Sequence, residues 1–391
     1  MAPRHRTAAA LVLAALLAGC QYAGPSPAPS SAPAAPSATD ALDQQARLFI
    51  GQGAVSAVVR LRWPGGEWDN AYGVRRLDTG DPAQPTDRVA VASVTKTFTA
   101  VTVLKLVDDK LIGLDDPVNT VIPGFTETLH PPGPITVREL LDQTSGIPDY
   151  IPVSLANVDF RTALAQPLTL QEALDDAGKQ PWPPTGVGLF QYSDTNYIAL
   201  GLLVQTLRHK PFAQVLREEV IDPLGLKHTS LDRLDLGQPD ILHGYVTFRG
   251  QRLDTTDNIH YAGTSGGGLV STMPDVDAFF AALFGGRLLS ASSLAAMETG
   301  PGLSPYALGM WKGPPGCTSG SHRFEGVGMH EDALAVAVAS DDGQYVASMA
   351  VVPPPLPVTS EDPSGDRERN LIESQMESTL NQTLSALCRA G

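Results

Sequence analysis

The chain has 391 residues, of which 42% are hydrophobic and 18% charged, so it holds enough apolar material for a large core in one or two domains. Its formal net charge of -15 argues against a nucleic-acid partner, because binding phosphates requires clustered Lys and Arg. We therefore expect a globular protein whose substrate is neutral or zwitterionic.

The N-terminus resembles an export signal. Arg4 to Arg6 is a positive segment, and Ala8 to Leu17 is an apolar stretch too short to span a bilayer as a stable helix. It ends in Leu-Ala-Gly before Cys20, which resembles the lipobox of bacterial lipoproteins. We expect residues 1–20 to be a lipoprotein signal peptide, so that lipid on Cys20 anchors the exported protein to the outer face of the cytoplasmic membrane. An ordinary signal peptide with an incidental Cys20 is the alternative.

Residues 21–41 are an expected tether. Between Ala23 and Ala38 almost every residue is Ala, Pro, Ser or Gly, a composition with too little apolar mass to pack. We expect this segment to hold a domain that spans residues 42–391 away from a membrane surface.

A hairpin and a long helix are predicted at the start of that domain. The β-branched run from Val55 to Leu61 precedes a Trp-Pro-Gly-Gly turn and a second strand-like stretch around residues 72–74. From Ser93 onward apolar residues recur at intervals of three and four, which predicts a helix with one apolar face. Gly113 and Pro117 end that helix.

Short helical patterns follow, and strand patterns return near the C-terminus. The predicted helices span residues 137–141, 197–207, 212–220 and 276–283, and the predicted strands span 333–339 and 345–352, before a final helix at 370–387. This order predicts an α/β (α+β) fold, in which one sheet built from N- and C-terminal segments is flanked by helices and meets an inserted all-helical lobe at a cleft.

Two cysteines, Cys317 and Cys388, remain after Cys20. In an exported protein an even remainder predicts a disulfide between them. A metal site is a poor alternative, because neither cysteine has a second ligand at zinc-finger spacing.

The first candidate for chemistry is Ser93-Val94-Thr95-Lys96, an S-x-x-K sequence at the start of the predicted helix. Ser93 and Lys96 lie one turn apart on one side of that helix, whose dipole favours developing negative charge. A serine hydroxyl is inert until a base takes its proton, and Lys96 is a candidate for that base if burial keeps it neutral. The alternative is an N-capping serine beside a solvated lysine.

The second candidate is Tyr192, in the stretch from Gln191 to Asn196 before an apolar helix. Together with the first motif, this stretch resembles the serine beta-lactamase and DD-peptidase family, in particular its low-molecular-weight DD-carboxypeptidase and class C group, whose second motif is Y-S-N or Y-A-N. The resemblance implies that Tyr192 relays protons with Lys96 across a cleft. A buried core aromatic is the alternative for Tyr192.

The resemblance covers the chain from about Leu42 to Cys388. Further matching segments are residues 92–116, 135–147, 223–226 and 266–272. The placing of the two C-terminal cysteines is similar to that in the actinomycete exocellular D-alanyl-D-alanine carboxypeptidase. The implied fold is beta-lactamase/transpeptidase-like, with an antiparallel sheet, and we expect a monomer without cofactor or metal.

The family's third motif, H-T-G or K-T-G on a strand lining the cleft, is where this chain departs from the pattern. Aligned without gaps, the matching positions are Phe324, Glu325 and Gly326, so a Phe replaces the residue that helps to bind a substrate carboxylate. A shifted register places His322 there, but it puts Phe324 at the glycine position, where a side chain would block the ligand. Both registers stay open.

Two further departures concern substrate binding. Trp311 stands where the actinomycete enzyme has an Arg that pairs with a carboxylate, and Lys312 or Arg323 are candidates to substitute for it. Asp194 replaces the Asn of the second motif, which removes an amide donor and adds a negative charge near the site.

Two rival interpretations are set aside. Gly263 to Gly267 match the G-x-S-x-G elbow of α/β-hydrolases, but the polar segment 257–260 precedes them where a buried strand is required, so we interpret the glycines as keeping backbone close to the cleft. His330 beside two acidic residues is interpreted as a polar turn rather than a cation site.

The resemblance and the two motifs predict acyl transfer through an ester on Ser93, acting on the D-alanyl-D-alanine end of peptidoglycan stem peptides. Lys96 and Tyr192 take and return the proton, backbone N–H groups of Ser93 and Val327 hold the oxyanion, and water deacylates. The alternatives are an esterase or beta-lactamase that uses a small ester or lactam, and a non-catalytic penicillin-binding or sensing lipoprotein.

Overall fold

The computed structural model describes residues 35–154, 160–183, 186–232, 236–257, 263–302, 304–316, 322–358 and 362–390. The chain divides into two units, Met1–Ala32 and Pro33–Gly391, and every described residue belongs to the second. The predicted signal peptide, Cys20 and Cys317 therefore lie outside the described residues. No helix in the described part combines the length and apolarity needed to cross a membrane.

Within the described residues, the core is a six-stranded antiparallel sheet in the order β2-β1-β10-β9-β8-β7. Its strands are β1 Ser56–Trp63, β2 Gly66–Gly73, β7 Trp311–Pro315, β8 His322–Met329, β9 Leu334–Ala339 and β10 Val346–Val352. Because β1 pairs with β10, the N-terminal hairpin and the C-terminal strands form one sheet. The predicted α/β architecture, with a sheet built from both ends of the domain, is confirmed.

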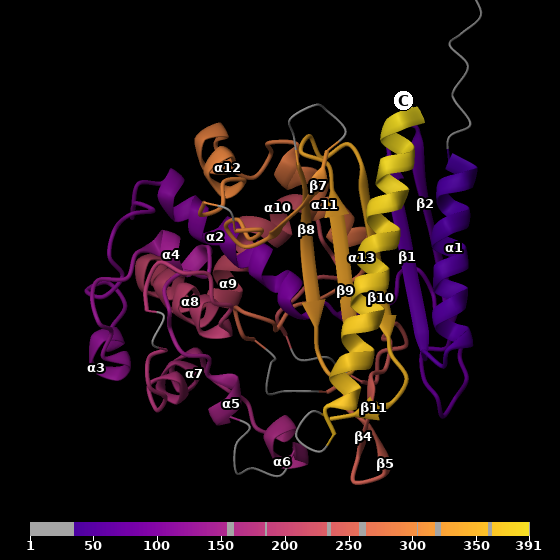
Figure 1. The fold of residues 1–391 in the computed structure, drawn as a ribbon, viewed down its shortest axis with the longest axis horizontal. Coiled ribbons are helices and arrows are strands. Elements are labelled where there is room, and N and C mark those ends of the chain that lie inside the picture. Colours follow the sequence, from indigo (N-terminus) through magenta and orange to yellow (C-terminus); the bar gives the residue numbers. More distant parts are fainter. Residues whose placement is uncertain are drawn as a thin grey trace, which may run out of the picture. The chain divides into compact units, whose positions relative to one another are not determined.

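The helices are α1 Ala35–Gly51, α2 Thr95–Asp108, α3 Phe125–Leu129, α4 Val137–Leu141, α5 Ile151–Ser154, α6 Phe160–Ala165, α7 Leu170–Ala177, α8 Asp194–Arg208, α9 Phe212–Leu216, α10 Asp222–Leu224, α11 Met273–Phe284, α12 Ala291–Met297 and α13 Ser364–Ala390. Those from α2 to α10 are inserted between sheet-forming parts of the chain and form the predicted helical lobe (Figure 1). Short ladders join β3 Val89–Ala90 to β6 Val270–Ser271, and β4 Tyr245–Phe248 to β5 Gln251–Asp254 and β11 Leu356–Pro357.

Helix α1 corrects the predicted boundary of the tether. Residues 35–41 were assigned to the tether, but they are helical. Ala38, Leu42, Ala46 and Phe49 recur at helical spacing and are all buried against the sheet. Their apolar contacts therefore extend the folded domain at least to Ala38.

The two faces of the sheet carry side chains of different size. In β9, Leu334, Val336 and Val338 face α1 and α13, which lie side by side along that face (Figure 1). The three alanines that alternate with them face α11 and the 3₁₀ turn η1, residues Ala92–Val94. Because alanine side chains are small, this turn and its serine can approach the sheet closely.

Helix α2 is buried on nearly all sides, from Thr95 to Leu104 without a break, so the prediction of a single apolar face was wrong. Phe98 stacks on Phe279 of α11 on the sheet side. The threonines are accommodated because their hydroxyls donate hydrogen bonds to backbone carbonyls, such as Thr97 to Gly309 at 2.8 Å. A helix surrounded by protein provides a rigid base for the site at its N-terminus.

Candidate active site

Ser93 lies in the η1 turn at the start of α2, directly after a strained residue. Ala92 has a φ of 46°, in the left-handed region that costs a non-glycine residue about 1–2 kcal/mol. Hydrogen bonds hold it there: the Thr95 hydroxyl donates to the Ala92 carbonyl at 2.6 Å, and the Leu269 N–H donates to that hydroxyl at 3.0 Å. This strain, fixed by the surrounding structure, presents the Ser93 hydroxyl at the edge of the lobe.

Lys96 is buried, with 1% of its surface exposed, and its ammonium faces three acceptors. Its Nζ donates to Ser93 Oγ at 2.9 Å, to Asp194 Oδ1 at 2.5 Å and to the Gly266 carbonyl at 2.8 Å. The three donors of the ammonium are therefore all used, and Asp194 supplies the opposite charge that a buried cation requires.

Tyr192 completes the contact with the serine, because its hydroxyl is hydrogen-bonded to the Ser93 side chain. Its ring faces Lys96 Nζ, which lies 5.1 Å from the ring centroid. Although 36% of the residue is exposed, burial of the hydroxyl, reinforced by the charge of Asp194, raises the pKa of Tyr192 well above 10. Tyr192 is therefore a protonated phenol. It can relay a proton, but it does not start the reaction as a phenolate base.

The N-terminus of α8 holds Asp194 in place. An acidic residue in the first turn is favoured by the helix dipole, and the Asp194 N–H donates to Asp149 Oδ2 at 3.3 Å. Burial, and then the charge of Asp194, raises the pKa of Asp149 to about 6. The loop before α8 is fixed by Gln143, whose side-chain oxygen accepts from the Ser193 N–H and the Asn196 amide.

Strand β8 approaches the nucleophile through Gly328. A Cβ at this position would lie 2.2 Å from the Val91 carbonyl oxygen and 2.9 Å from the Ser93 nitrogen, so no side chain fits. Gly328 is therefore the strand glycine of the third motif, and Gly326, two residues earlier, occupies the position of the expected His or Lys. Sequence counting missed this register because a two-residue shift in a loop leaves the apolar pattern of the strands unchanged.

The residues first assigned to the third motif lie elsewhere. Phe324 is 3% exposed and stacks on Phe284 in the core, so its predicted contact with substrate was wrong. Glu325 accepts a hydrogen bond from Asn381 of α13, on the face of the sheet opposite the nucleophile. Gly326 is buried against α11, and His322 is at the exposed start of β8, opposite Pro315. Both registers considered from the sequence are thereby corrected.

Met329, rather than the predicted Val327, lines the cavity that contains Ser93. The His330 N–H donates to the carbonyl of Ala333, the residue before β9. Because amides alternate in direction along a strand, the N–H groups of Val327 and Met329 point to the other edge of β8. Pairing of β7 with β8 stops at Glu325, which leaves that edge open. Met329, next to Gly328, lines the same cavity as Ser93, and its N–H can bind an oxyanion together with that of Ser93.

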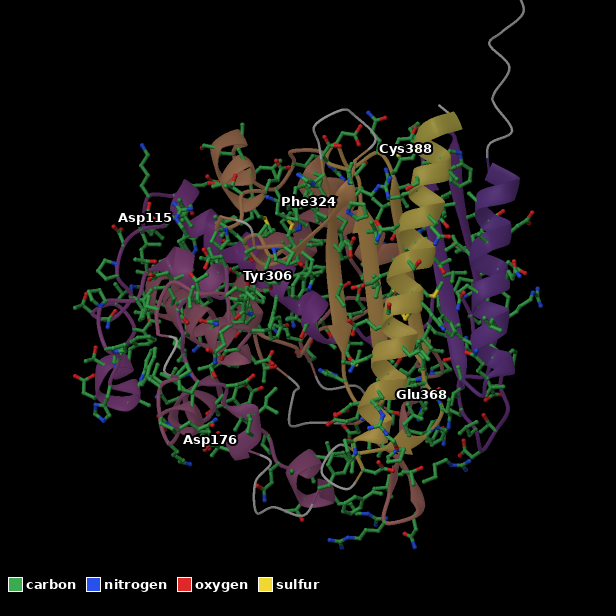
Figure 2. All side chains as sticks on the ribbon, in the orientation of Figure 1. Asp115, Asp176, Tyr306, Phe324, Glu368 and Cys388 are labelled. Carbon is green, nitrogen blue, oxygen red and sulfur yellow. The ribbon has the colours of Figure 1, made fainter. Side chains whose placement is uncertain are left out.

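An aromatic wall, formed by Phe190, Tyr192, Tyr306 and Trp311, borders the nucleophile. Trp311 is parallel to Tyr192 at 6.3 Å between ring centroids and meets Tyr306 edge-on at 4.8 Å. Phe190 and Tyr192 are more than one-third exposed, so the wall offers open apolar surface. Figure 2 shows Tyr306 between the helices of the lobe and the sheet. Trp311, expected to bind substrate, thus lies beside Tyr192, which contacts Ser93.

The two cations proposed to replace the missing Arg lie away from this wall. Arg323 donates from Nη1 to the Asn381 carbonyl of α13 at 2.8 Å. Lys312 lines a hollow between β7 and α13 together with Glu325. Neither residue can bind a substrate carboxylate at Ser93, and that suggestion was wrong.

A cavity of about 190 Å³ opens on the other side of Ser93. Its lining includes Asp194, Met329 and His330, and also Glu331 and the buried Arg369. Burial lowers the pKa of His330 to about 4. The charge of Asp194 opposes this shift, and the charge of Lys96 adds to it. His330, interpreted from the sequence as part of a polar turn, thus lines the same cavity as Ser93.

Three further predictions concern Ser265, the metal sites and the disulfide. Ser265, the serine of the G-x-S-x-G sequence, is fully buried and donates to the Tyr197 carbonyl at 2.7 Å, whereas the adjacent Gly266 carbonyl binds Lys96. The part of the chain that the structure describes holds no cluster of three or more potential metal ligands. Cys388, near the end of α13 in Figure 2, is disulfide-bonded, while its predicted partner Cys317 lies outside the described residues.

Several known proteins are similar to this chain in sequence or in fold. A family model described as Beta-lactamase matches residues 42–318. Protein flp of Staphylococcus aureus (strain MW2) is 30% identical over 178 residues, which are 45% of this chain and 34% of the relative. Penicillin-binding protein 4* of Bacillus subtilis (strain 168) is 27% identical over 183 residues, 46% of this chain and 39% of the relative. The chain thus spans little more than a third of either relative's length.

Among solved structures, the D-stereospecific amidohydrolase from Streptomyces sp. is 27% identical, with a TM-score of 0.70 over 81% of this chain and 94% of its own. The family match covers more than half of the chain, and the fold agrees with it. The chain therefore belongs to the beta-lactamase family, whose beta-lactamase/transpeptidase-like members include serine hydrolases.

Proposed function

We propose that this protein is a serine acyl hydrolase that works through an ester on Ser93. The observation that carries the proposal is the convergence of Lys96 and Tyr192 on one partly exposed serine hydroxyl, beside the amide of Met329. A nucleophile, proton-transfer groups and oxyanion donors are the parts that acyl transfer requires.

Acylation follows from these contacts. Ser93 Oγ attacks the carbonyl carbon as its proton passes to Lys96, whose own proton can move to Asp194 across the 2.5 Å contact. The N–H groups of Ser93 and Met329 hold the developing oxyanion. Tyr192 passes a proton to the leaving group as the scissile bond breaks, and it regains that proton from Lys96.

The strand side of the cleft favours a substrate with an uncharged leaving group. A peptide with a C-terminal carboxylate needs a cation at the leaving-group side, and Trp311 and Gly326 occupy the positions where the family resemblance expects polar groups. The aromatic wall instead offers apolar contacts. We therefore favour an ester or amide with an uncharged, apolar leaving group over the D-alanyl-D-alanine carboxypeptidase activity that the sequence first indicated.

Four substrates separate these functions: a p-nitrophenyl ester, a cephalosporin, and a D-alanyl-D-alanine peptide with either a free C-terminal carboxylate or a C-terminal amide. We expect the ester to be turned over fastest and the amide-capped peptide to be preferred to the free acid. A preference for the free acid would restore the carboxypeptidase assignment. Turnover that persists in Ser93→Ala would overturn the nucleophile.

Export and lipid attachment remain part of the proposal, supported by the sequence around Cys20. Metabolic labelling with a fatty acid should mark the wild-type chain in the membrane fraction and leave Cys20→Ala unlabelled. Equal labelling of both chains would contradict lipid attachment at this cysteine.

A further inference from the structure

His330 is placed where a second catalytic group would act. It follows β8 directly and lines the cavity that contains Ser93. Its Nε2 atom lies 3.3 Å from the point that a Cβ on Gly267 would occupy. Because the neighbouring Gly266 carbonyl binds Lys96, the imidazole stands against the loop that holds the lysine.

The alternation of the strand directs the imidazole toward the nucleophile turn. Residues two apart on a strand share a face, so His330 projects on the same face as Gly328, whose backbone abuts the Ser93 nitrogen. Met329, between them, supplies the oxyanion amide. The imidazole is therefore next to the carbonyl of any acyl group on Ser93, on the cavity side.

Hydrolysis of the ester needs a base for the water and a proton for the departing Ser93 Oγ. Lys96 donates all three of its protons in the structure, and it must return one to Ser93 Oγ when the ester breaks. Tyr192 is held protonated by burial. A separate base for the water leaves Lys96 with the proton that Ser93 Oγ needs, and the cavity lining supplies an imidazole.

Burial keeps the His330 ring neutral near neutral pH. Burial and Lys96 favour the neutral ring, and Asp194 opposes them, with a resulting pKa of about 4. A neutral imidazole has a lone pair for a proton. The other charged side chains that line the same cavity are Glu331, Asp366 and Arg369, the last two paired at 2.7 Å.

We propose that His330 is the base that activates the water which hydrolyses the Ser93 ester. The inference rests on the proposed acyl-enzyme. The water oxygen bonds to the ester carbonyl carbon as its proton passes to the imidazole. The C–Oγ bond then breaks, Ser93 Oγ takes a proton from Lys96, and the imidazolium returns its proton to Lys96 through water in the cavity.

Burst kinetics on the full chain test this role. With a p-nitrophenyl ester, the burst reports acylation and the steady state reports deacylation. We expect His330→Gln to keep the burst amplitude and its rate within about threefold, while the steady-state rate falls about 10²–10³-fold. His322→Gln, at the exposed start of the same strand, is the matched control and should behave as wild type.

Two further readouts exclude a merely structural role. Intact mass should show that His330→Gln accumulates the acyl-enzyme, and hydroxylamine, a nucleophile that needs no base, should release the acyl group from it. Loss of burst and steady state together, in both His330→Gln and His330→Asn, would overturn the proposal, as would an unchanged steady-state rate. A missing burst in the wild type would instead refute the acyl-enzyme on which the proposal rests.

Discussion

The two sides of the cleft differ in what they contribute. The helical side, at the starts of α2 and α8, keeps the serine, lysine and tyrosine that the family motifs predict, and it holds them by buried hydrogen bonds. The strand side, β8 and β7, carries glycines and Trp311 in place of the polar groups that the family resemblance predicts. Bond breaking and substrate choice are thus carried by different elements, and one can change while the other is retained.

The physical reason lies in how each side contributes to the chemistry. The helical side acts through side-chain atoms whose partners are 2.5–2.9 Å away, so a substitution there leaves a buried charge unpaired. The strand side acts on the oxyanion through backbone amides, which survive any side-chain change that spares Gly328. Its side chains are therefore free to select a different leaving group.

The largest effect should come from removing the charged group of the helical side. Lys96→Ala leaves Ser93 without its proton acceptor and Asp194 without its counter-charge, so we expect kcat/KM for an ester to fall about 10³–10⁴-fold. Lys105→Ala, on the same helix, is the control. If Lys96→Ala retains activity within tenfold of wild type, Lys96 is not the group that takes the Ser93 proton, and the helical side does not carry the chemistry.

A glycine substitution tests the point where the two sides meet. Gly328→Ala introduces a methyl group 2.2 Å from the Val91 carbonyl oxygen, which forces Ser93 and the Met329 amide apart. Because loss of one oxyanion donor costs about 10²–10³-fold, we expect the acylation burst to slow by roughly 10²-fold. Gly133→Ala, at a position with no atom within 4 Å, should leave the burst unchanged. An unaffected burst in Gly328→Ala would refute the register.

The aromatic wall predicts a change of preference with little loss of chemistry. Trp311→Arg should raise the ratio of kcat/KM for a free-acid peptide to that for its amide-capped form by about tenfold, because a charge-assisted hydrogen bond contributes about 1.5–3 kcal/mol. Trp311→Gln removes the ring without adding charge and separates the two effects. If the ratio is the same in all three proteins, the wall does not contact the leaving group.

The smallest effect is the pH dependence of wild-type activity that Asp149 and Asp194, next to Lys96, should produce. As pH falls through about 6, Asp149 gains a proton and weakens its hold on the Asp194 N–H, so wild-type activity should decline there. Asp194→Asn removes the neighbouring negative charge, which lowers the pKa of Asp149 and moves this limb of the pH–rate profile to lower pH.

Asp194→Asn keeps a hydrogen-bond acceptor for Lys96 but cannot take its proton or pair its charge, so activity at pH 7 should fall by about 10²-fold, and the limb is read from the residual activity. A thermal unfolding curve for Asp194→Asn at each pH controls for stability. A limb that stays near pH 6 in this variant would show that another group controls it.

The contrast between the two sides also explains what the sequence could predict. Ser93 and Lys96 lie in one S-x-x-K motif, and Tyr192 lies in a stretch that resembles the second motif of the family, so sequence and resemblance together located them. The strands β9 and β10 were predicted because all of their residues except Ser348 are apolar. Strands β7 and β8 were missed because Lys, Pro, Arg and Glu interrupt their pattern.

The strand-side residues needed coordinates. Gly328 is distinguished from Gly326 only by its contact with the Ser93 backbone, which no local pattern records. The assignments of Met329 and His330 follow from that register. Asp194 was read correctly as an added negative charge, but its pairing with Lys96 depends on how α8 lies against α2.

The acyl-enzyme on Ser93 is tested most directly by intact mass spectrometry of the full chain, after exposure to a penicillin and, separately, to a p-nitrophenyl ester. We expect one acyl adduct per chain, mapped to the peptide that contains Ser93 and absent from Ser93→Ala. No adduct with either reagent, or an adduct that persists in Ser93→Ala, would contradict it.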